Sequence, residues 1–351
     1  MRNSSYKIAL AIVLIYFSLV ACEKNNTSTH TKSQWITDFI TEIKSGNYPK
    51  IYGISWWHEN FDSTFFTINS SVESQNTYRK MVDDDIFITS CSFENKKLIP
   101  VQGKIYHSAF PFFGGTEDKV SSAKINDFEY LANKKIAWAY FSNNWLDSLV
   151  FPSNSISIIT SNGKTPFLRM MYRSEFEENH EDPKYKMIDI VNGKYDSWLK
   201  KWAKEAKNTN INLLAEFGTE VNGKWFSWNG YYSGAGVKDK YGDKEYPDGP
   251  EIFRDAYRYI IDICKQQGVD NITWFFHLDV NDDPEQWWNS PEYYYPGDDY
   301  IDWIGVSIYG PYTPDEDYIE PKVLISKAYK KMETISGNKP FAVLEFGVTE
   351  L

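Results

Sequence analysis

Cysteine and histidine are scarce in this chain, which has 3 Cys and 5 His among its 351 residues. So few of either argue against a disulfide-stapled scaffold and against a metal centre built from these side chains. Basic residues are outnumbered as well: 37 Lys and Arg stand against 48 Asp and Glu, and the net charge of −11 repels a phosphate backbone. We therefore expect no metal, no other cofactor and no nucleic-acid partner.

Long apolar runs are also lacking, apart from one near the start of the chain. It covers residues 8–21, follows Arg2 and Lys7, and is too short to span a bilayer. A charged start and a short apolar middle are typical of a secretory signal. Residues 1–21 are thus predicted to be a signal peptide that directs the protein through the secretory pathway.

The end of this run, Leu19-Val20-Ala21-Cys22, resembles the bacterial lipobox. The resemblance implies that Cys22 is lipidated and becomes the mature N-terminus, whereas a cysteine placed there by chance is the alternative. Acyl chains would anchor the protein in the bacterial cell envelope, where we expect the outer membrane. The polar residues 22–33 are then predicted to be a tether.

Aromatic side chains, by contrast, are abundant. The chain has 13 Trp, 25 Tyr and 22 Phe, which together make up 17% of its residues. Such rings suit a neutral ligand with flat faces, such as a sugar, but the packing of a core consumes aromatic residues too. The rest of the composition, 42% hydrophobic and 24% charged, is that of a globular protein.

From residue 104 onward, apolar segments rich in β-branched and aromatic residues alternate with helix-like segments. The predicted strands are 104–110, 135–141, 165–171, 212–220, 271–278, 301–309 and 340–346. The predicted helices are 120–132, 153–162, 194–207, 251–267 and 321–335. Alternation on this scale predicts parallel β/α units, and near-continuous apolar strands fit a sheet that helices cover.

Seven such strands are one fewer than a (β/α)8 TIM barrel requires. The N-terminal residues 34–82 supply a helix, a strand at 50–57 and a second helix, which together would complete the missing unit. We therefore predict one barrel domain over residues 34–351, circularly permuted, with residues 83–103 as the connector into the first strand. An open or broken barrel from a truncated gene is the alternative.

Two glutamates occupy the ends of predicted strands. Glu220 ends the fourth strand and opens a run rich in Gly and Trp, and Glu345 lies near the end of the seventh strand. Side chains at the C-terminal ends of barrel strands point into the active-site mouth. A pair of carboxyl groups at one site is what hydrolysis of a glycosidic bond needs.

Several motifs together resemble glycoside hydrolase family 26. They are the Glu220-x-Asn-Gly-x-Trp run, the strand with Arg169, the Phe253-Arg254-Asp255-Ala256-Tyr257 helix, Tyr295-Pro296-Gly297-Asp298, Asp302-Trp303-Ile304-Gly305 and Lys339-Pro340 before Glu345. The similarity covers residues 104–351 and extends to 34–62. It implies a (β/α)8 barrel that acts on a β-linked polysaccharide, β-mannan or a related β-glucan or xylan, by retaining, endo-acting hydrolysis.

Carried over to this chain, the resemblance implies that Glu220 is the general acid/base and Glu345 the nucleophile. One position departs from the pattern, because Thr219 stands where the family's mannanases usually have His before the acid/base. A hydroxyl cannot carry the charge of an imidazolium, so the mannan specificity is open. A catalytically weak carbohydrate-binding protein, or a transglycosylating envelope protein, is the alternative function.

Further side chains are expected at the same mouth as substrate contacts. Tyr309 is implied to hydrogen-bond the nucleophile, and Arg169 is expected either to contact substrate or to pair with Glu216 or Glu345. The other candidates are Trp56, Trp57, Trp145, Trp225, Trp228, His107 and His277. Packing is the alternative for each Trp, and alternation along the strand sends only one of Trp56 and Trp57 inward. We expect a monomer whose partners are the polysaccharide and, through the anchor, the membrane.

Overall fold

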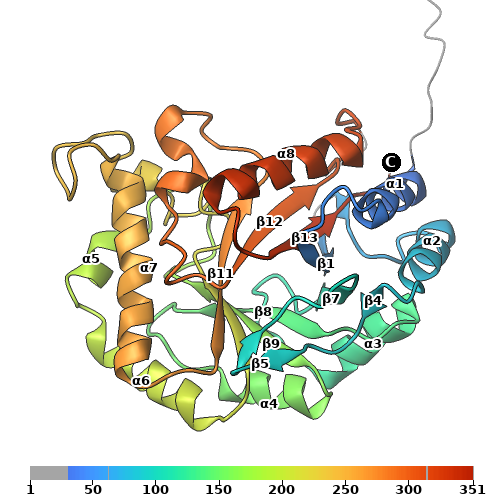
Figure 1. The fold of residues 1–351 in the computed structure, drawn as a ribbon, viewed down its shortest axis with the longest axis horizontal. Coiled ribbons are helices and arrows are strands. Elements are labelled where there is room, and N and C mark those ends of the chain that lie inside the picture. Colours follow the sequence, from blue (N-terminus) through green and yellow to red (C-terminus); the bar gives the residue numbers. More distant parts are fainter. Residues whose placement is uncertain (1–30, 62, 314, 351) are drawn as a thin grey trace, which may run out of the picture.

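The computed structural model describes residues 31–61, 63–313 and 315–350. Within these residues, eight parallel strands close into a barrel (Figure 1). In barrel order they are β7 (Ile105–Pro111), β8 (Trp138–Asn144), β9 (Thr165–Met171), β10 (Leu213–Phe217), β11 (Ile272–Asp279), β12 (Trp303–Tyr309), β13 (Phe341–Gly347) and β1 (Ile51–His58). The predicted (β/α)8 barrel is confirmed.

Helices surround this barrel in the described part of the chain (Figure 1). They are α1 (Lys32–Lys44), α2 (Val72–Val82), α3 (Ser122–Ala132), α4 (Ser153–Ser161), α5 (Met187–Val191), α6 (Asp196–Asn208), α7 (Asp248–Gln266) and α8 (Pro321–Ile335), with short 3₁₀ turns at Gly230–Ser233, Trp287–Asn289 and Pro291–Tyr293. The long helices bury an apolar stripe, and apart from α1, which precedes β1, they come after a strand in the chain, as the alternation in the sequence predicts.

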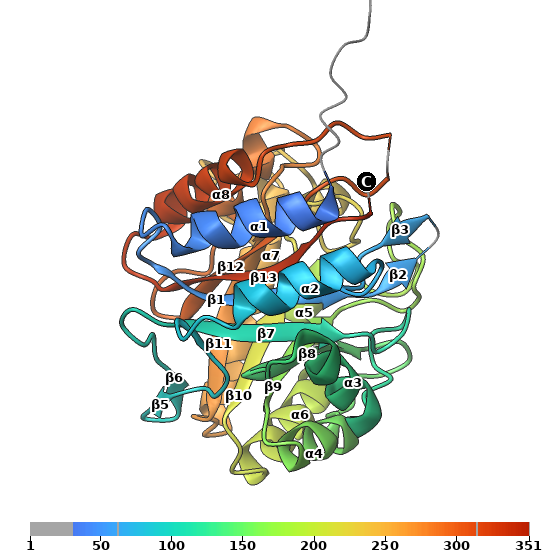
Figure 2. The same cartoon turned by 90° about the vertical axis from the view of Figure 1, so that its right-hand side faces the viewer.

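Strand β1 closes the barrel between the last strand and the first strand of the C-terminal part. Ile54 pairs with Val343 of β13 on one side and with His107 of β7 on the other. Helix α1 packs beside the end of the chain, where Phe39 stacks on Phe346 with ring centroids 4.5 Å apart (Figure 2). The alternative of an open barrel is therefore wrong, while the rotated strand order relative to family 26 stays a prediction.

The boundary predicted between tether and barrel is wrong by two residues. Thr31 caps α1, and Lys32 and Ser33 already belong to the helix. The Lys32 ammonium is buried and donates to the Phe65 carbonyl at 2.5 Å and to the Thr67 carbonyl at 2.9 Å. Residues 1–30, with the predicted signal peptide and Cys22, lie outside the described residues.

Two small hairpins lie at opposite ends of the barrel (Figure 2). The predicted connector 83–103 contains strand β4 (Phe87–Ile88), which adds to the edge of β7, and the hairpin of β5 (Phe93–Glu94) and β6 (Lys97–Leu98). That hairpin covers the N-terminal end of the barrel, where the Trp303 indole donates to the Leu98 carbonyl at 3.0 Å. The hairpin of β2 (Asn60–Phe61) and β3 (Thr64–Phe65) stands at the C-terminal end.

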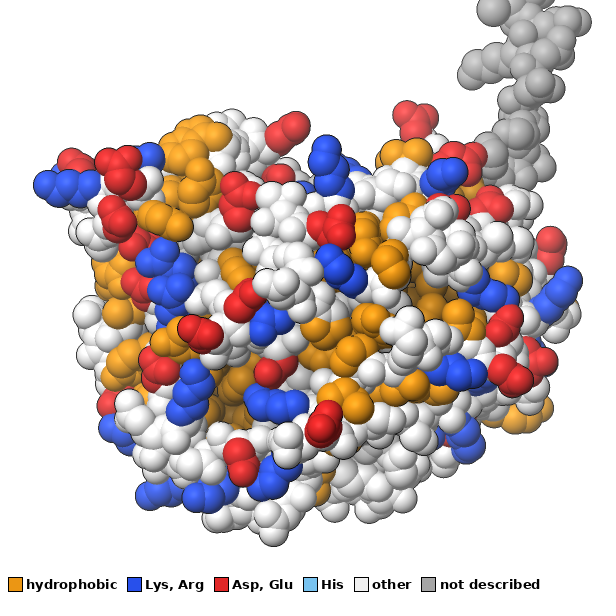
Figure 3. Space-filling model, in the orientation of Figure 1, with side chains coloured by type: hydrophobic (Ala, Val, Ile, Leu, Met, Phe, Trp, Pro, Cys, Tyr) orange, Lys and Arg blue, Asp and Glu red, His pale blue; other side chains and the backbone are white. Residues whose placement is uncertain are grey.

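The surface view in Figure 3 shows acidic and basic side chains interspersed over one face of the molecule, so no field of a single charge covers that face. None of the helices in the described ranges has both the length and the apolar character needed to cross a bilayer.

Gly53 tests whether the N-terminal segment is an integral part of the barrel. A Cβ at this position in β1 would come within 2.6 Å of the buried Trp138 ring on β8. We expect Gly53→Ala to lower the free energy of unfolding by about 1–3 kcal/mol, because overpacking strains a filled core. Urea denaturation measures this, with Gly337→Ala as control, since the nearest atom to a Cβ there is the end of the Lys50 side chain at 4.0 Å. Equal stability of the two variants would contradict the prediction.

Candidate active site

A cleft of about 760 Å³ opens where the strands end. Its walls come from residues that follow β1, β7, β9, β10, β11 and β12, in agreement with the usual place of a barrel's active site. Carboxyl groups and rings predominate in the lining, which includes Trp57, Glu59, Phe61, Phe112, Glu117, Arg169, Glu178, Glu220, Trp225, Asp279, Tyr309, Tyr312 and Glu345. Both predicted catalytic glutamates therefore line one cavity.

Glu220 is held by its own loop. Its backbone adopts φ 48°, in the left-handed region that a side-chain-bearing residue rarely occupies, and such strain is common at functional sites. The Trp225 indole donates a hydrogen bond of 2.8 Å to Oε2 of Glu220. Burial raises the pKa of Glu220 to about 7, and the nearby Asp279 carboxylate adds to the rise. A carboxyl group that keeps its proton near neutral pH fits the general-acid role that the sequence predicts for Glu220.

The Asn, Gly and Trp of the Glu-x-Asn-Gly-x-Trp run each have a structural role around Glu220. The Asn222 amide donates to the Asp279 carbonyl at 2.9 Å and accepts from the Asp279 N–H at 2.7 Å, which ties the loop after β10 to the end of β11. Gly223 lies directly against the Trp225 indole, and a Cβ there would overlap the ring. The glycine thus lets Trp225 fold back onto Glu220.

Gly223→Ala is expected to displace the indole from Glu220. Loss of one hydrogen bond to an ionisable group is worth about 1.5 kcal/mol, so we expect kcat to fall roughly tenfold. The measurement is steady-state kinetics together with a melting curve. A variant that keeps its kcat, or one that loses activity only in proportion to lost folded protein, would show that the contact does not matter for turnover.

Glu345 has one neutral partner, the Tyr309 hydroxyl, and one positively charged partner, the Arg169 guanidinium. The Tyr309 hydroxyl donates to its Oε2 at 2.7 Å, and the Arg169 guanidinium lies 3.1 Å from its Oε1. Burial raises the pKa of Glu345 to about 7, whereas Arg169 and the Tyr309 hydrogen bond lower it. Because two buried carboxyl groups in one cleft titrate as a pair, the one beside the guanidinium ionises first. The predicted contact of Tyr309 with Glu345 is present.

Arg169 is an ion-pair partner of Glu345, the candidate nucleophile. Besides Glu345, its guanidinium pairs with Glu117 at 2.7 Å and with Glu216 at 3.6 Å, and only 2% of the residue is exposed. Burial disfavours the charge of Arg169, but these carboxylates raise its pKa well above the ordinary value. Of the two roles left open by the sequence, the ion pair is the one that the geometry supports.

His277 does not reach the cleft, so its predicted contact with sugar is wrong. The ring is buried beneath the site, where Nδ1 lies 3.0 Å from Glu216 and Nε2 lies 2.9 Å from the Ser307 hydroxyl. Burial lowers its pKa, but the charge of Glu216 and the hydrogen bond with it outweigh this and raise the pKa. Ser307 in turn lowers the pKa of Glu220, so the network influences the candidate acid/base.

Four further predicted substrate contacts are wrong because the side chains are buried in the core. The Trp56 ring points away from the barrel and packs on Tyr78 and Phe346. The others are Trp145 beneath Tyr172, Trp228 with its indole bonded to the Thr219 carbonyl, and His107 bonded to Tyr78 and Lys135. Trp57 and Trp225 do line the cleft, and alternation along β1 explains why Trp57 rather than Trp56 faces it.

Comparison with known proteins finds the family that the sequence motifs resemble. Residues 174–344 match the model of glycosyl hydrolase family 26, a stretch that contains both Glu220 and the strand leading to Glu345. The resemblance to family 26 is confirmed. The matched family is one of glycosyl hydrolases, which is the enzyme class that the motifs predict.

Individual relatives are distant. Endoglucanase H of Acetivibrio thermocellus is 24% identical over 252 residues, which is 70% of this chain and 25% of that protein. The chain thus spans about a quarter of the length of this relative. Among solved structures, a mannanase of Bacillus subtilis is 14% identical with a TM-score of 0.44, covering 90% of this chain and 76% of its own. A family 26 β-mannanase of Bacteroides ovatus is 15% identical with a TM-score of 0.41, covering 89% and 76%.

The position that departs from family 26 has its own arrangement here. Thr219 is buried, and its hydroxyl lies 2.8 Å from Nδ1 of His277. An imidazole is thus present next to this position, but it comes from β11 rather than from the residue before Glu220. The contact between Thr219 and His277 depends on the register of the barrel strands and could not be predicted from the sequence.

Sequence reasoning missed several cleft residues. Glu59 and Glu117 belong to no motif, and the most exposed rings along the cleft, Phe61, Phe112 and Tyr312, lie beside the predicted Trp57 and Trp225. The position of Phe61 in the hairpin after β1 depends on a turn without any sequence motif. The signal that could have found Glu59 is its shared alternation with Trp57.

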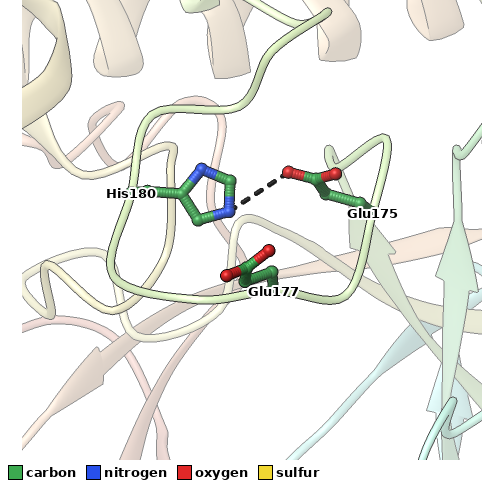
Figure 4. A group of neighbouring side chains, drawn as sticks. All are labelled: Glu175, Glu177 and His180. Atoms are coloured by element: carbon green, nitrogen blue, oxygen red, sulfur yellow. Dashed lines mark ion pairs between the residues drawn. The ribbon is translucent and has the colours of Figure 1, made fainter.

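One group of side chains outside the cleft has a composition suited to a metal. Glu175, Glu177 and His180, in the loop after β9, each offer a ligand atom within 4.8 Å of the others (Figure 4). His180 and Glu175 already form an ion pair of 3.2 Å, and Glu177 is exposed. Exposed acidic groups of this kind are common without a metal, so the group carries no assignment.

Proposed function

We propose that this protein is a retaining glycoside hydrolase that cleaves within a β-linked polysaccharide, of the β-mannan, β-glucan or xylan type. The observation that carries the proposal is the unequal pair of carboxyl groups in one cleft. Glu345 has a guanidinium and a phenol as partners, which favour its ionised form, while Glu220 has Asp279 nearby, which favours its protonated form. Retaining hydrolysis needs this division of roles.

In the first step of the proposed reaction, Glu345 attacks the anomeric carbon and Glu220 gives its proton to the leaving oxygen. Tyr309 and Arg169 orient the attacking carboxylate and keep it ionised. In the second step, Glu220, now ionised, takes a proton from the water that cleaves the glycosyl-enzyme. The Trp225 indole supports that ionised state by donating to Oε2 of Glu220.

A polysaccharide substrate fits the shape and lining of the cleft. Exposed rings in the lining, among them Phe61, Phe112 and Tyr312, offer faces on which the CH groups of sugars can pack. The family 26 relatives named above include mannanases, and the longer relative from Acetivibrio thermocellus is named an endoglucanase. These names make mannan and mixed-linkage glucan the first substrates to assay, with xylan as the third.

The test is kinetics on mannan, mixed-linkage glucan and xylan, with products followed by size and by the anomeric configuration at early times. We expect internal cleavage of at least one polymer and a product of retained configuration. Products longer than the substrate would support the transglycosylating alternative. Binding without any product would contradict the proposed hydrolysis.

Asp279 gives the proposal a pH signature. Its carboxylate lies near Glu220 and raises the pKa of that carboxyl group, which must be protonated for the first step. Removing the negative charge in Asp279→Asn therefore lowers the pKa of Glu220, and the basic limb of the kcat/KM profile moves to lower pH by about one unit. Asparagine keeps an acceptor for the Asn281 N–H, which now bonds Asp279 at 2.7 Å. An unmoved basic limb would rule out Glu220 as the group that titrates there.

We further propose that the protein is anchored in the bacterial envelope through a lipid on Cys22. The support is the sequence Leu19-Val20-Ala21-Cys22 after a short apolar run. Growth with labelled palmitate is expected to label the full-length protein, and Cys22→Ser to abolish the label and release the protein from the membrane fraction. Labelling that survives Cys22→Ser would contradict the anchor.

A further inference from the structure

Glu59 is a buried carboxylate that the proposed reaction does not use. It follows β1 directly, and because it shares the alternation of Trp57, its side chain turns into the cleft. The backbone around it is fixed, since its carbonyl accepts from the Phe66 N–H at 3.1 Å and the next residue, Asn60, bonds the Thr67 N–H at 3.0 Å. The hairpin after β1 thus holds Glu59 in place at the cleft wall.

The carboxylate of Glu59 lacks a donor. Only 6% of the residue is exposed, and no side chain or backbone N–H in the described ranges donates a hydrogen bond to its carboxylate or forms an ion pair with it. Burial raises the pKa of Glu59 to about 7, and the charge of Glu117 adds to the rise. Because Glu59 lines the cleft and has no protein donor, its carboxylate oxygens are available to donors of a ligand there.

The cations nearby are engaged elsewhere. Arg169 lowers the pKa of Glu59 through its charge, but its guanidinium forms its ion pairs with Glu117 and Glu345. Lys124 lies over the Phe112 ring, 5.2 Å from its centroid. The free acceptors of Glu59 therefore face the cleft, beside the Trp57 ring and the half-exposed Phe61.

We propose that Glu59 is a substrate-binding residue that accepts hydrogen bonds from a pair of neighbouring hydroxyl groups on a pyranose ring seated in the cleft beside the exposed ring of Phe61. This inference rests on the proposed function and extends it to a specific sugar contact. Two vicinal hydroxyls match the two oxygens of one carboxylate, and a hydrogen bond to a charged acceptor is among the stronger ones in proteins. The exposed Phe61 ring would pack on an apolar face of the same sugar.

The proposal is tested with hexasaccharides of β-mannan, mixed-linkage β-glucan and xylan as probes. Calorimetric titration uses the full chain with Glu345→Ala, which prevents turnover, and compares it with the double variant that also carries Glu59→Gln. For the hexasaccharide that binds most tightly, we expect Glu59→Gln to weaken the affinity about tenfold, because a charged acceptor is lost. The matched control is Glu94→Gln, an exposed glutamate on β5 at the other end of the barrel.

Thermal unfolding separates binding from a structural role. If Glu59 serves the ligand, Glu59→Gln unfolds at the same or a higher temperature than its parent while the affinity falls. Unchanged affinity, or a loss of affinity that parallels a loss of stability, would overturn the inference. So would the absence of binding by all three hexasaccharides.

The two proposals fail in different ways. If the native chain hydrolyses a polymer and Glu59→Gln changes neither Kd nor KM, the proposed Glu59 contact is contradicted while the proposed hydrolase activity stands. Binding that depends on Glu59, in a native chain that cleaves none of the three polymers, would support the contact and contradict the hydrolase.

Discussion

Replacement of Glu345 by alanine is expected to abolish polysaccharide hydrolysis and to leave binding intact. Without the nucleophile no glycosyl-enzyme can form, so kcat should fall by about 10⁴-fold or more. The fold should survive, because Arg169 keeps Glu117 at 2.7 Å and Glu216 at 3.6 Å as partners after Glu345 is removed. The measurement is release of reducing ends from the preferred polymer, alongside calorimetric binding of its hexasaccharide.

A small external nucleophile supplies the positive control for this variant. Azide can occupy the space of the missing carboxylate, and we expect it to restore turnover of an activated aryl β-glycoside with inversion at the anomeric carbon. Glu94→Gln, which changes an exposed glutamate far from the cleft, should retain full activity. If binding without product were already a property of the native chain and Glu345→Ala left it unchanged, the hydrolase proposal would fail.

The barrel itself could be predicted from local patterns. Each predicted strand from 104–110 to 340–346 coincides with an observed one to within a few residues, because apolar β-rich runs between helices leave little choice of structure. The closing strand could be predicted by counting, since seven strands leave two unpaired edges in a barrel. The hairpins β2–β3 and β5–β6 could not, because strands of two residues carry no periodic signal.

The two catalytic candidates were predictable for a different reason. A strand end followed by a fixed motif places Glu220 and Glu345 at the mouth without knowledge of the packing. The tryptophans were not predictable in this way, because an aromatic ring at a strand end serves the core or the cleft according to parity. Trp56 and Trp57 are adjacent in sequence and face opposite layers, and only Trp57 lines the cleft.

His277 shows what sequence reasoning lacks most. At a strand end it resembles a sugar contact, but register places it one layer below the cleft, between Glu216 and Ser307. Buried polar groups need partners, and those partners come from strands separated by about 60 and 30 residues in sequence. The contact list of a buried histidine is therefore a tertiary property that no local pattern contains.

Glu220→Gln is expected to affect substrates unequally. Glutamine keeps the shape and can still accept from the Trp225 indole, which bonds Oε2 at 2.8 Å, but it cannot donate the proton that a sugar leaving group needs. On polysaccharide we expect kcat to fall by about 10²–10⁴-fold, the usual worth of general acid–base catalysis. In an aryl β-glycoside with an acidic phenol, the phenolate can leave without that proton, so the rate of the first step should be nearly unchanged.

The second step of the same variant then becomes limiting, because no base activates the water. We expect a burst of phenol followed by slow turnover, and a glycosyl adduct on Glu345 visible by mass spectrometry of the intact protein and its peptides. Azide, which needs no base, should accelerate the steady state. Equal losses of kcat on polysaccharide and on aryl glycoside, with no adduct, would mean that Glu220 has only a structural role in its loop, where its backbone is left-handed and its side chain bonds Trp225. Asp279 would then be the next candidate for the acid/base.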